Sequence, residues 1–335
     1  MTNSENPAGP FPGYVLYGGE LSYFTRKLEA ALKFYGVPFE FRAKSRDNTA
    51  EVEQRSGTHQ VPVLQTPENW MIADTTPILQ LLDSRYPLRR MFPSGALGVL
   101  VHVLEEYFDE WIARTMVHYR WHYPESAAFA SLRIAQGDES MAARVRDWGP
   151  RACRATGTDS ARQQEAAEAE YERLLAAMET QFAETRFLLG DRPTALDCVV
   201  LGGLRAHTLM DPDPRRVVSD YPTVVAWCER EADGWRGDGE LAPFPESTGF
   251  ARFVLGEMQD TYRPFVLANR DALQAGARAF QAEVYGEPVS YLTRPYPERS
   301  RRMVMERIEH QLTVDEQRPV VAWLHDTGLA DGLFD

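Results

Sequence analysis

The sequence predicts an α+β protein with a mixed strand-and-helix domain over residues 13–88, an all-helical domain over residues 95–240 and a mostly helical extension over residues 243–335. Short apolar or alternating runs of strand length dominate the first part, whereas later segments repeat their hydrophobic residues at helical spacing. A chain of 335 residues also exceeds one ordinary domain, so two domains with an extension are the natural expectation.

Strand and helix signals follow one another in a definite order through the first domain. A polar leader rich in proline and glycine, residues 1–12, precedes it and is expected to be disordered. The aromatic and β-branched run 14–17 predicts a buried strand. Ser22 and Gly36 predict the start and end of the first helix, because serine is a favoured N-cap and glycine a favoured C-terminal cap. The remaining signals predict a strand at 38–41, a polar segment, strands at 60–65 and 70–72, and a helix that begins at residues 74–77.

Pro62 lies inside one of the predicted strands, where it would remove a hydrogen bond from the sheet. A proline is tolerated at the start of a strand, especially with a cis peptide bond before it. Only about 5% of X-Pro bonds are cis, so the residues alone do not establish the cis form.

Three segments of this domain resemble motifs of the glutathione transferase superfamily, in the order and at the separations that the family shows. The resemblance in the order of strands and helices covers about residues 14–86. The resemblance implies a thioredoxin-like first domain that binds glutathione, a cis bond before Pro62, an all-α second domain, and a C-terminal extension outside the family's usual plan. The segments are Ser22-Tyr23-Phe24-Thr25-Arg26-Lys27, which is similar to the family's Ser-Pro-Phe-x-Arg motif, Val61-Pro62-Val63-Leu64, and Asp74-Thr75 at the head of a helix.

The resemblance assigns glutathione-binding roles to residues 60–62 and 74–75. Thr75 and the helix N-terminus would hold the γ-glutamyl carboxylate, and Asp74 would accept from the amine. Val61 would pair with the cysteinyl backbone like an added strand, with Pro62 fixing that geometry. Gln60, or its neighbour His59, would touch the glycyl carboxylate. The alternative for Asp74 and Thr75 is a plain N-cap pair.

Ser22 and Tyr23 are rival candidates for activating the glutathione thiol. A free thiol has a pKa of roughly 8.5, and an oriented hydroxyl near a helix N-terminus lowers it by hydrogen-bonding the thiolate. The spacing of Ser22 to Arg26 fits the serine-type members of the family better. Tyr23 stands where many relatives have proline, and other classes use a tyrosine. Neither position is a cysteine, which argues against the disulfide-exchanging members.

The helical part carries one strong folding motif and several weaker site candidates. Thr194 and Asp197 predict a capping box at the head of an apolar helix, which extends the resemblance to about residue 235. Residues 99–123 read as one long aromatic-rich helix. His118 and His122 are four residues apart and could share a metal, but a packed helix is the favoured interpretation, and no metal is expected. On the family's precedent, possible second-substrate contacts on this helix are Met116, Tyr119, Arg120 and Tyr123.

Composition limits the possible partners. A net charge of −13 argues against nucleic acid, and no apolar run approaches the roughly 18 residues that a membrane span needs. Three cysteines without a C-x-x-C pair argue against a disulfide framework or a thiolate zinc site.

The functional expectation is a cytoplasmic, dimeric detoxification enzyme that uses glutathione as co-substrate to attack a small hydrophobic electrophile. Glutathione-dependent isomerisation, dehalogenation or ether cleavage would reuse the same first domain. A binding or structural protein that kept the fold without catalysis is the alternative from a different class, because fold alone does not fix function.

Overall fold

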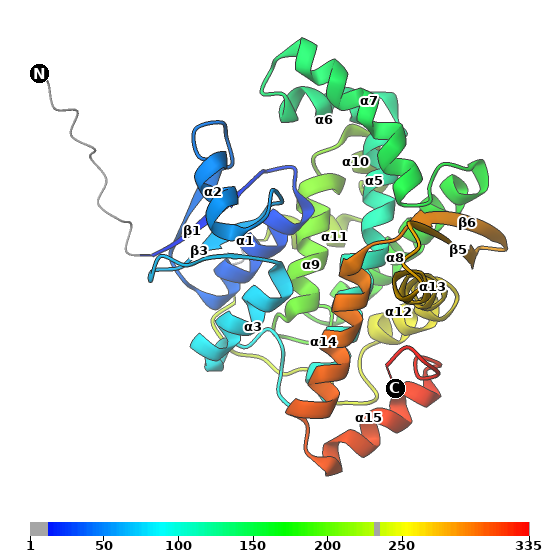
Figure 1. Ribbon diagram of the computed structural model, residues 1–335. Coiled ribbons are helices and arrows are strands. Elements are labelled where there is room, and N and C mark those ends of the chain that lie inside the picture. Colours follow the sequence, from blue (N-terminus) through cyan, green and yellow to red (C-terminus); the bar gives the residue numbers. More distant parts are fainter. Residues whose placement is uncertain (1–12, 231–234, 335) are drawn as a thin grey trace, which may run out of the picture.

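The computed structural model describes residues 13–230 and 235–334 (Figure 1). The leader expected at residues 1–12 lies outside the described residues. In Figure 1 the blue N-terminal domain lies beside the green helices, and the yellow-to-red extension occupies the lower right of the view. None of the described helices combines the length and the apolar character that a bilayer crossing requires.

The first domain is built on a four-stranded sheet in the order β2-β1-β3-β4. The first two strands are parallel, and the other two neighbouring pairs are antiparallel. The predicted strands are therefore present, and their bounds are β1 (Tyr14–Gly18), β2 (Phe39–Ala43), β3 (Val63–Gln65) and β4 (Met71–Ala73).

Helices cover both faces of this sheet, as a thioredoxin-like domain requires. Val15 and Tyr17 of β1 pack with Val52 of α2, whereas Tyr14 and Leu16 join the main core with α1 and α3. This division follows from the alternation of side chains along a strand. The helices are α1 (Tyr23–Tyr35), α2 (Thr49–Ser56), which fills the polar segment between predicted strands, and α3 (Thr75–Arg85), which the short 3₁₀ helix η1 (Pro87–Arg89) follows.

The caps of the first helix confirm the sequence prediction. The Ser22 side chain accepts a hydrogen bond from the Thr25 N–H at 3.3 Å, and Gly36 ends the helix with a φ of 68°. A left-handed C-terminal residue of this kind is usually glycine because a β-carbon would clash there.

Helices make up most of the described residues of the second domain. The long helix predicted over residues 99–123 is divided by a π-helical segment, because one turn of the backbone widens at Tyr107–Ile112. The elements are α4 (Ala96–Glu106), the π segment η2 (Tyr107–Ile112), α5 (Ala113–Trp121), α6 (Pro124–Ile134), α7 (Glu139–Ala155), α8 (Ala161–Glu184), α9 (Ala195–Gly203), η3 (Leu204–Thr208), α10 (Pro212–Val218) and α11 (Pro222–Glu229).

The predicted capping box is present, and it joins the start of α9 to the segment that precedes it. Both Thr194 and Asp197 are fully buried, and the Asp197 carboxylate accepts from the N–H and the hydroxyl of Thr194 and from the Leu188 N–H, at 2.8–2.9 Å. The helix that it starts, α9, packs closely on α1: a β-carbon on Gly202 would lie 2.5 Å from the Lys27 backbone nitrogen. Small residues on α9 therefore allow the two domains to dock.

The extension differs from its prediction in one respect. The extension was expected to be mostly helical, but after α13 ends at Gln274 a β-hairpin follows, with its turn at Tyr285 and Gly286, both at positive φ. Burial alternates along the first hairpin strand, because the two faces of a strand point in opposite directions. The elements are α12 (Gly249–Asp260), α13 (Tyr262–Gln274), β5 (Ala279–Val284), β6 (Glu287–Leu292), α14 (Pro295–Gln311) and α15 (Val314–Asp326).

The extension shares one hydrophobic core with the second domain. Phe250 stacks on Phe108, and Phe265 packs against Trp111 with ring centroids 5.5 Å apart. Helix α14, orange in Figure 1, packs along α4 and α13. The extension is therefore an integral part of the fold.

Candidate functional site

The sheet register brings the predicted glutathione-binding segments to one edge. Tyr17 of β1 lies opposite Val63 of β3, and Val63 lies opposite Ala73 of β4. Because these neighbours run antiparallel, the loop after β1, the segment before β3 and the start of α3 meet at the same end of the sheet. Ser22, Pro62 and Asp74 belong to those three segments.

The segment before β3 offers free backbone groups at this edge. The Val61–Pro62 peptide bond is cis, as the resemblance implied. In the described part of the chain, neither the N–H nor the C=O of Val61 has a hydrogen-bond partner. Thr75 is buried, and its hydroxyl is likewise without a partner within those residues. The edge thus presents a donor and an acceptor from one backbone residue next to a hydroxyl at a helix start.

Asp74 holds an uncommon backbone conformation at the centre of this edge. Its φ of 73° and ψ of 116° lie outside the regions that non-glycine residues usually occupy. Burial raises the pKa of its carboxyl, and the Arg299 and Lys27 charges oppose that shift only in part. Strained residues of this kind persist where surrounding structure holds them, and they cluster at functional sites.

The extension reaches this edge through the start of α14. The Tyr296 hydroxyl donates to Oε1 of Gln60 at 2.8 Å, and Nη1 of Arg299 lies 3.1 Å from the Asp74 carboxylate. Tyr296 and Gln60 also line a cleft of about 580 Å³ beside α2, together with His59. No local signal in the sequence indicates that residues 296 and 299 contact residues 60 and 74.

Ser22 and Tyr23 differ in where their hydroxyl groups lie. The Ser22 oxygen is half-buried and accepts from the Thr25 N–H, which leaves its own O–H free to donate. The Tyr23 hydroxyl donates to the Phe108 carbonyl at 3.1 Å inside the core, and burial holds its pKa well above the usual range. The geometry therefore favours Ser22 over Tyr23 as a donor to a bound thiolate.

The four residues nominated for the second substrate contact other parts of the helical domain. Met116 accepts from the Thr208 hydroxyl, Tyr119 stacks on Tyr123, and the Tyr123 hydroxyl donates to Glu168 at 2.7 Å. These contacts support packing among the helices, which is the usual role of an aromatic stripe at helical spacing.

Arg120, the fourth of them, contacts the loop that precedes α1. Its buried guanidinium pairs with Asp211 at 2.8 Å and donates to the Leu21 carbonyl at 2.7 Å. Leu21 directly precedes Ser22, so Arg120 ties the loop that carries Ser22 to the second domain.

A buried ionic cluster of Lys27, Glu105, Asp109 and Glu110 lies near Asp74 and was not predicted from the sequence. Lys27 is fully buried, and its ammonium contacts Glu105 and lies 2.6 Å from Asp109. Burial raises the pKa of Asp109 to about 7, against the opposing charge of Lys27. Burial likewise raises the pKa of Glu110 to about 7, although Arg294 of the extension lies 3.8 Å away. The only hint in the sequence was that Lys27, one of three lysines, ends the serine motif.

His102, Glu105 and Glu106 form the one group of metal-type ligands in the described residues, with ligand atoms within 4.8 Å of one another. Nδ1 of His102 accepts from Nε of Arg307 at 3.2 Å. In a neutral imidazole the proton then sits on Nε2, the atom 3.3 Å from Glu106. A metal would need a lone pair on that nitrogen, so the donor set fits an N–H facing a carboxylate better than a metal ion. The pair His118 and His122 stacks instead, and His118 lies 2.7 Å from Glu168.

Comparisons with known proteins locate the same two domains. The family model described as glutathione S-transferase, N-terminal domain, matches residues 16–90, and the one described as glutathione S-transferase, C-terminal domain, matches residues 159–230. A search of curated proteins returned no significant match.

Similar solved structures include a β-etherase from Sphingobium sp. strain SYK-6, with 17% identity, a TM-score of 0.48, and coverage of 66% of this chain and 97% of that one. A glutathione S-transferase from Rhodospirillum rubrum shows 18% identity, a TM-score of 0.46 and coverage of 66% and 90%. One from Methylobacterium radiotolerans, in complex with glutathione sulfonate, shows 22% identity, a TM-score of 0.42 and coverage of 66% and 92%. Both family models match in the expected order, so residues 16–90 and 159–230 are similar to the N-terminal and C-terminal domains of the glutathione S-transferases.

Proposed function

We propose that the chain binds glutathione at the edge formed by residues 60–62 and 74–75 and activates its thiol for attack on a small hydrophobic electrophile. One observation carries the proposal: the unpartnered backbone of Val61, ahead of a cis proline, lies at the same sheet edge as Asp74, which holds a strained conformation at the start of α3. These are the groups that an extended anionic tripeptide with one free amine needs.

The tripeptide would lie along the sheet edge. Its cysteinyl N–H and C=O would pair with Val61 as an added antiparallel strand. The N-terminus of α3 and the Thr75 hydroxyl would receive the γ-glutamyl carboxylate, because free N–H groups at a helix start bind anions. Asp74 would accept from the amine, and Gln60 would lie towards the glycyl end.

The extension would act on glutathione binding as an intramolecular competitor. Arg299 is a cation that contacts Asp74, the same group that the amine of glutathione requires. The Arg299 side chain is 56% exposed, and exposed ion pairs contribute little, so it can be displaced. Tyr296 would border the glycyl end through Gln60.

Thiol activation would come from Ser22. Its O–H would donate to the sulfur and stabilise the thiolate, so that the thiol proton leaves to solvent and the sulfur attacks the electrophile directly. The homodimer and the cytoplasmic location expected from the resemblance remain predictions alongside this proposal.

The thiol pKa of bound glutathione tests the proposal. Ultraviolet titration of the thiolate on the wild type should give a pKa below that of free glutathione. Ser22→Ala should bring the pKa back towards the free value while keeping most of the affinity, and Tyr23→Phe should leave it unchanged. An unchanged thiol pKa in Ser22→Ala, or no glutathione binding by the wild type, would overturn the proposal.

A further inference from the structure

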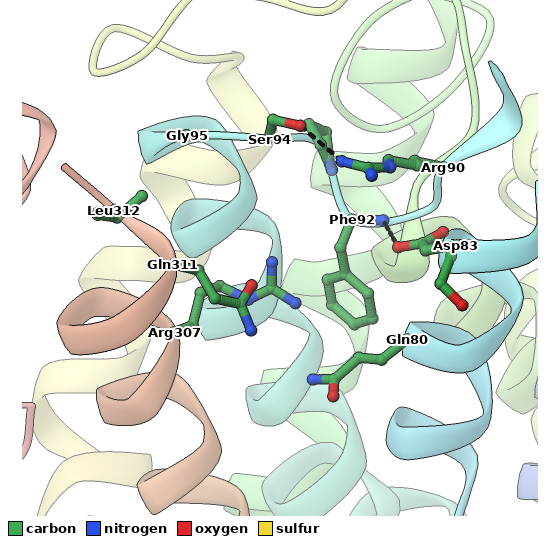
Figure 2. Close-up of a pocket in the computed structure, with 11 residues that line it drawn as sticks. Gln80, Asp83, Arg90, Phe92, Ser94, Gly95, Arg307, Gln311 and Leu312 are labelled. Atoms are coloured by element: carbon green, nitrogen blue, oxygen red, sulfur yellow. Dashed lines mark hydrogen bonds between the residues drawn. The ribbon is translucent and has the colours of Figure 1, made fainter. Parts of the chain in front are cut away.

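A second cleft, of about 280 Å³, lies between α3, the segment before α4, and α14 (Figure 2). It is separate from the end of the sheet that carries residues 60–62 and 74–75, which we call the glutathione edge. Asp83, which helps to line it, is near the end of α3, whereas Asp74 precedes the start of that helix. Arg307 lies eight residues beyond Arg299 on α14, roughly 12 Å further along the helix axis.

Arg307 is a buried cation without a carboxylate partner. The residue is 7% exposed, and no carboxylate oxygen in residues 13–230 or 235–334 lies within 4.0 Å of its guanidinium. Its Nε donates to the neutral His102 ring, and the guanidinium lies over the Phe92 ring at 4.8 Å. Its two terminal nitrogens have no hydrogen-bond partner in that same part of the chain. Buried charges are nearly always paired, so a buried guanidinium without a carboxylate partner points to a ligand that supplies the negative charge.

Arg90 brings a second cation to the same cleft. Its Nη1 donates to the Ser94 hydroxyl at 2.8 Å, and its Nε is buried without a partner. Within the described chain Arg90 also has no carboxylate partner. Figure 2 shows Arg307 extending from α14 towards Phe92 and the Arg90 side chain running towards Ser94.

The nearby carboxylates are already engaged. Asp83 accepts from the Tyr35 hydroxyl and from the Met91 and Phe92 N–H groups at 2.6–3.0 Å. Glu105, more distant, contacts the Lys27 ammonium. The cleft is lined by two arginines and by one carboxylate, that of Asp83. It is therefore locally positive, although the net charge of the chain is −13.

We propose that this cleft binds a small oxyanion, a phosphate or sulfate group held between Arg307 and Arg90. Guanidinium groups match such oxyanions because their N–H groups form parallel charge-assisted hydrogen bonds. Ser94, Gln80 and Gln311 line the same cleft and offer neutral donors. The volume lies just below the range of about 300–1,000 Å³ typical of drug-sized ligands, which suits a small anion or a short molecule that carries one.

The bound anion would also fasten the extension to the rest of the protein. Arg307 and Gln311 belong to α14, whereas Arg90 and Ser94 belong to the segment that joins the two family-type domains. An anion bridging them would add a contact across that boundary. Binding should therefore raise the melting temperature of the whole chain.

Calorimetry and thermal melting with inorganic phosphate, at constant ionic strength set by chloride, test this site. The wild type should bind phosphate saturably and melt at a higher temperature in its presence. Arg307→Gln and Arg90→Gln should each weaken binding at least tenfold, whereas Arg318→Gln, an exposed arginine on α15, should leave the affinity unchanged.

Phenyl phosphate and sulfate separate the sources of the anion. Binding of the monoester at least as tight as that of phosphate would assign the cleft to a phosphorylated molecule, and tighter binding of either inorganic ion would assign it to the free ion. Arg90→Gln keeps the test valid if Arg307→Gln fails to fold, since Arg90 is only partly buried. No saturable phosphate binding, or equal binding in all four proteins, would overturn the proposal.

Discussion

The glutathione edge and the arginine cleft are opposite in charge, although α14 contributes to both. At the edge, Asp74, Asp109 and Glu110 supply negative charge, and cations from α1 and the extension contact them. At the cleft, Arg90 and Arg307 supply positive charge, and the Asp83 carboxylate, which helps to line it, already accepts from two backbone N–H groups. The edge therefore suits a ligand with an amine, and the cleft suits an oxyanion.

Lys27 and Arg307 are both buried cations, and they differ in whether a carboxylate pairs with them. Lys27 is fully buried, and its ammonium group pairs with the carboxylates of Glu105 and Asp109. It also contacts the Thr76 hydroxyl, so it links α1 to α3 and η2. Arg307 is buried almost as deeply, and no carboxylate of the described residues pairs with it. Removing Lys27 would leave two buried carboxylates without a counter-charge, whereas Arg307 has N–H groups that are free, in the described part of the chain, to bind a ligand.

Removing the paired cation should have the largest effect. Lys27→Met leaves the carboxylates of Glu105 and Asp109 buried without their counter-charge, which should cost about 3–5 kcal/mol of unfolding free energy. Chemical denaturation at neutral pH measures the change. Lys33→Met, which removes a partly exposed ion pair with Glu29 on the same helix, is the control and should cost under about 1 kcal/mol. Equal losses in the two variants would show that the buried ion pairs of Lys27 matter no more than the partly exposed pair of Lys33.

Removing the carboxylate at the edge should affect binding rather than folding. Asp74→Asn keeps the size of the side chain but loses the charge that attracts the amine, so glutathione affinity should fall at least about tenfold, or about 1.4 kcal/mol. Calorimetry with glutathione measures this fall. Asp159→Asn, at an exposed ion pair far along the chain, should bind as the wild type does. An unchanged affinity in Asp74→Asn would place the amine elsewhere.

The raised pKa of Glu110 should make the protein less stable as pH rises. The folded-state pKa of about 7 exceeds the ordinary value of 4.5, so the folded protein holds the proton more tightly and loses that advantage as pH rises towards 7. From about pH 6 to about pH 8 the loss should be about 1 kcal/mol.

Glu110→Gln should remove this part of the pH dependence because a neutral amide does not titrate. Denaturation curves for the wild type and the variant at the two pH values measure it. A variant that loses stability with pH as steeply as the wild type would show that Glu110 titrates normally.

Removing the Arg299 cation, which competes with the amine of glutathione for Asp74, should have the smallest effect. Arg299→Gln frees the Asp74 carboxylate before glutathione arrives, so affinity should rise by a factor of about 2–5, since an exposed ion pair is worth about 0–1 kcal/mol. The gain should shrink at high salt, which already screens the pair. Calorimetry at two ionic strengths measures both effects. Weaker binding in this variant would make Arg299 a glutathione contact instead of a competitor.

Local signals explain how much of the fold the sequence predicts. Ser22 and Gly36 at the ends of α1, the strand order around Pro62, and the box of Thr194 and Asp197 each depend on residues within a few positions of one another. The hairpin after Gln274 was missed because its first strand continues an apolar helical pattern, and only the Tyr285-Gly286 turn separates it from the next strand.

The site was less predictable, because much of it depends on distant pairs. Motifs indicated Val61, Pro62 and Asp74, but nothing near residue 74 in the sequence indicates Arg299. Arg307 and His102 are likewise 205 positions apart. The resemblance also nominated Tyr119 and Tyr123, whose rings pack on each other in the helical domain.

A crystal structure of the protein with bound glutathione tests the central claim most directly. We expect the cysteinyl backbone of glutathione to pair with Val61, its amine to contact Asp74, and Arg299 to be displaced from that carboxylate. Glutathione bound away from residues 60–75, or present at the edge with Arg299 still on Asp74, would contradict it.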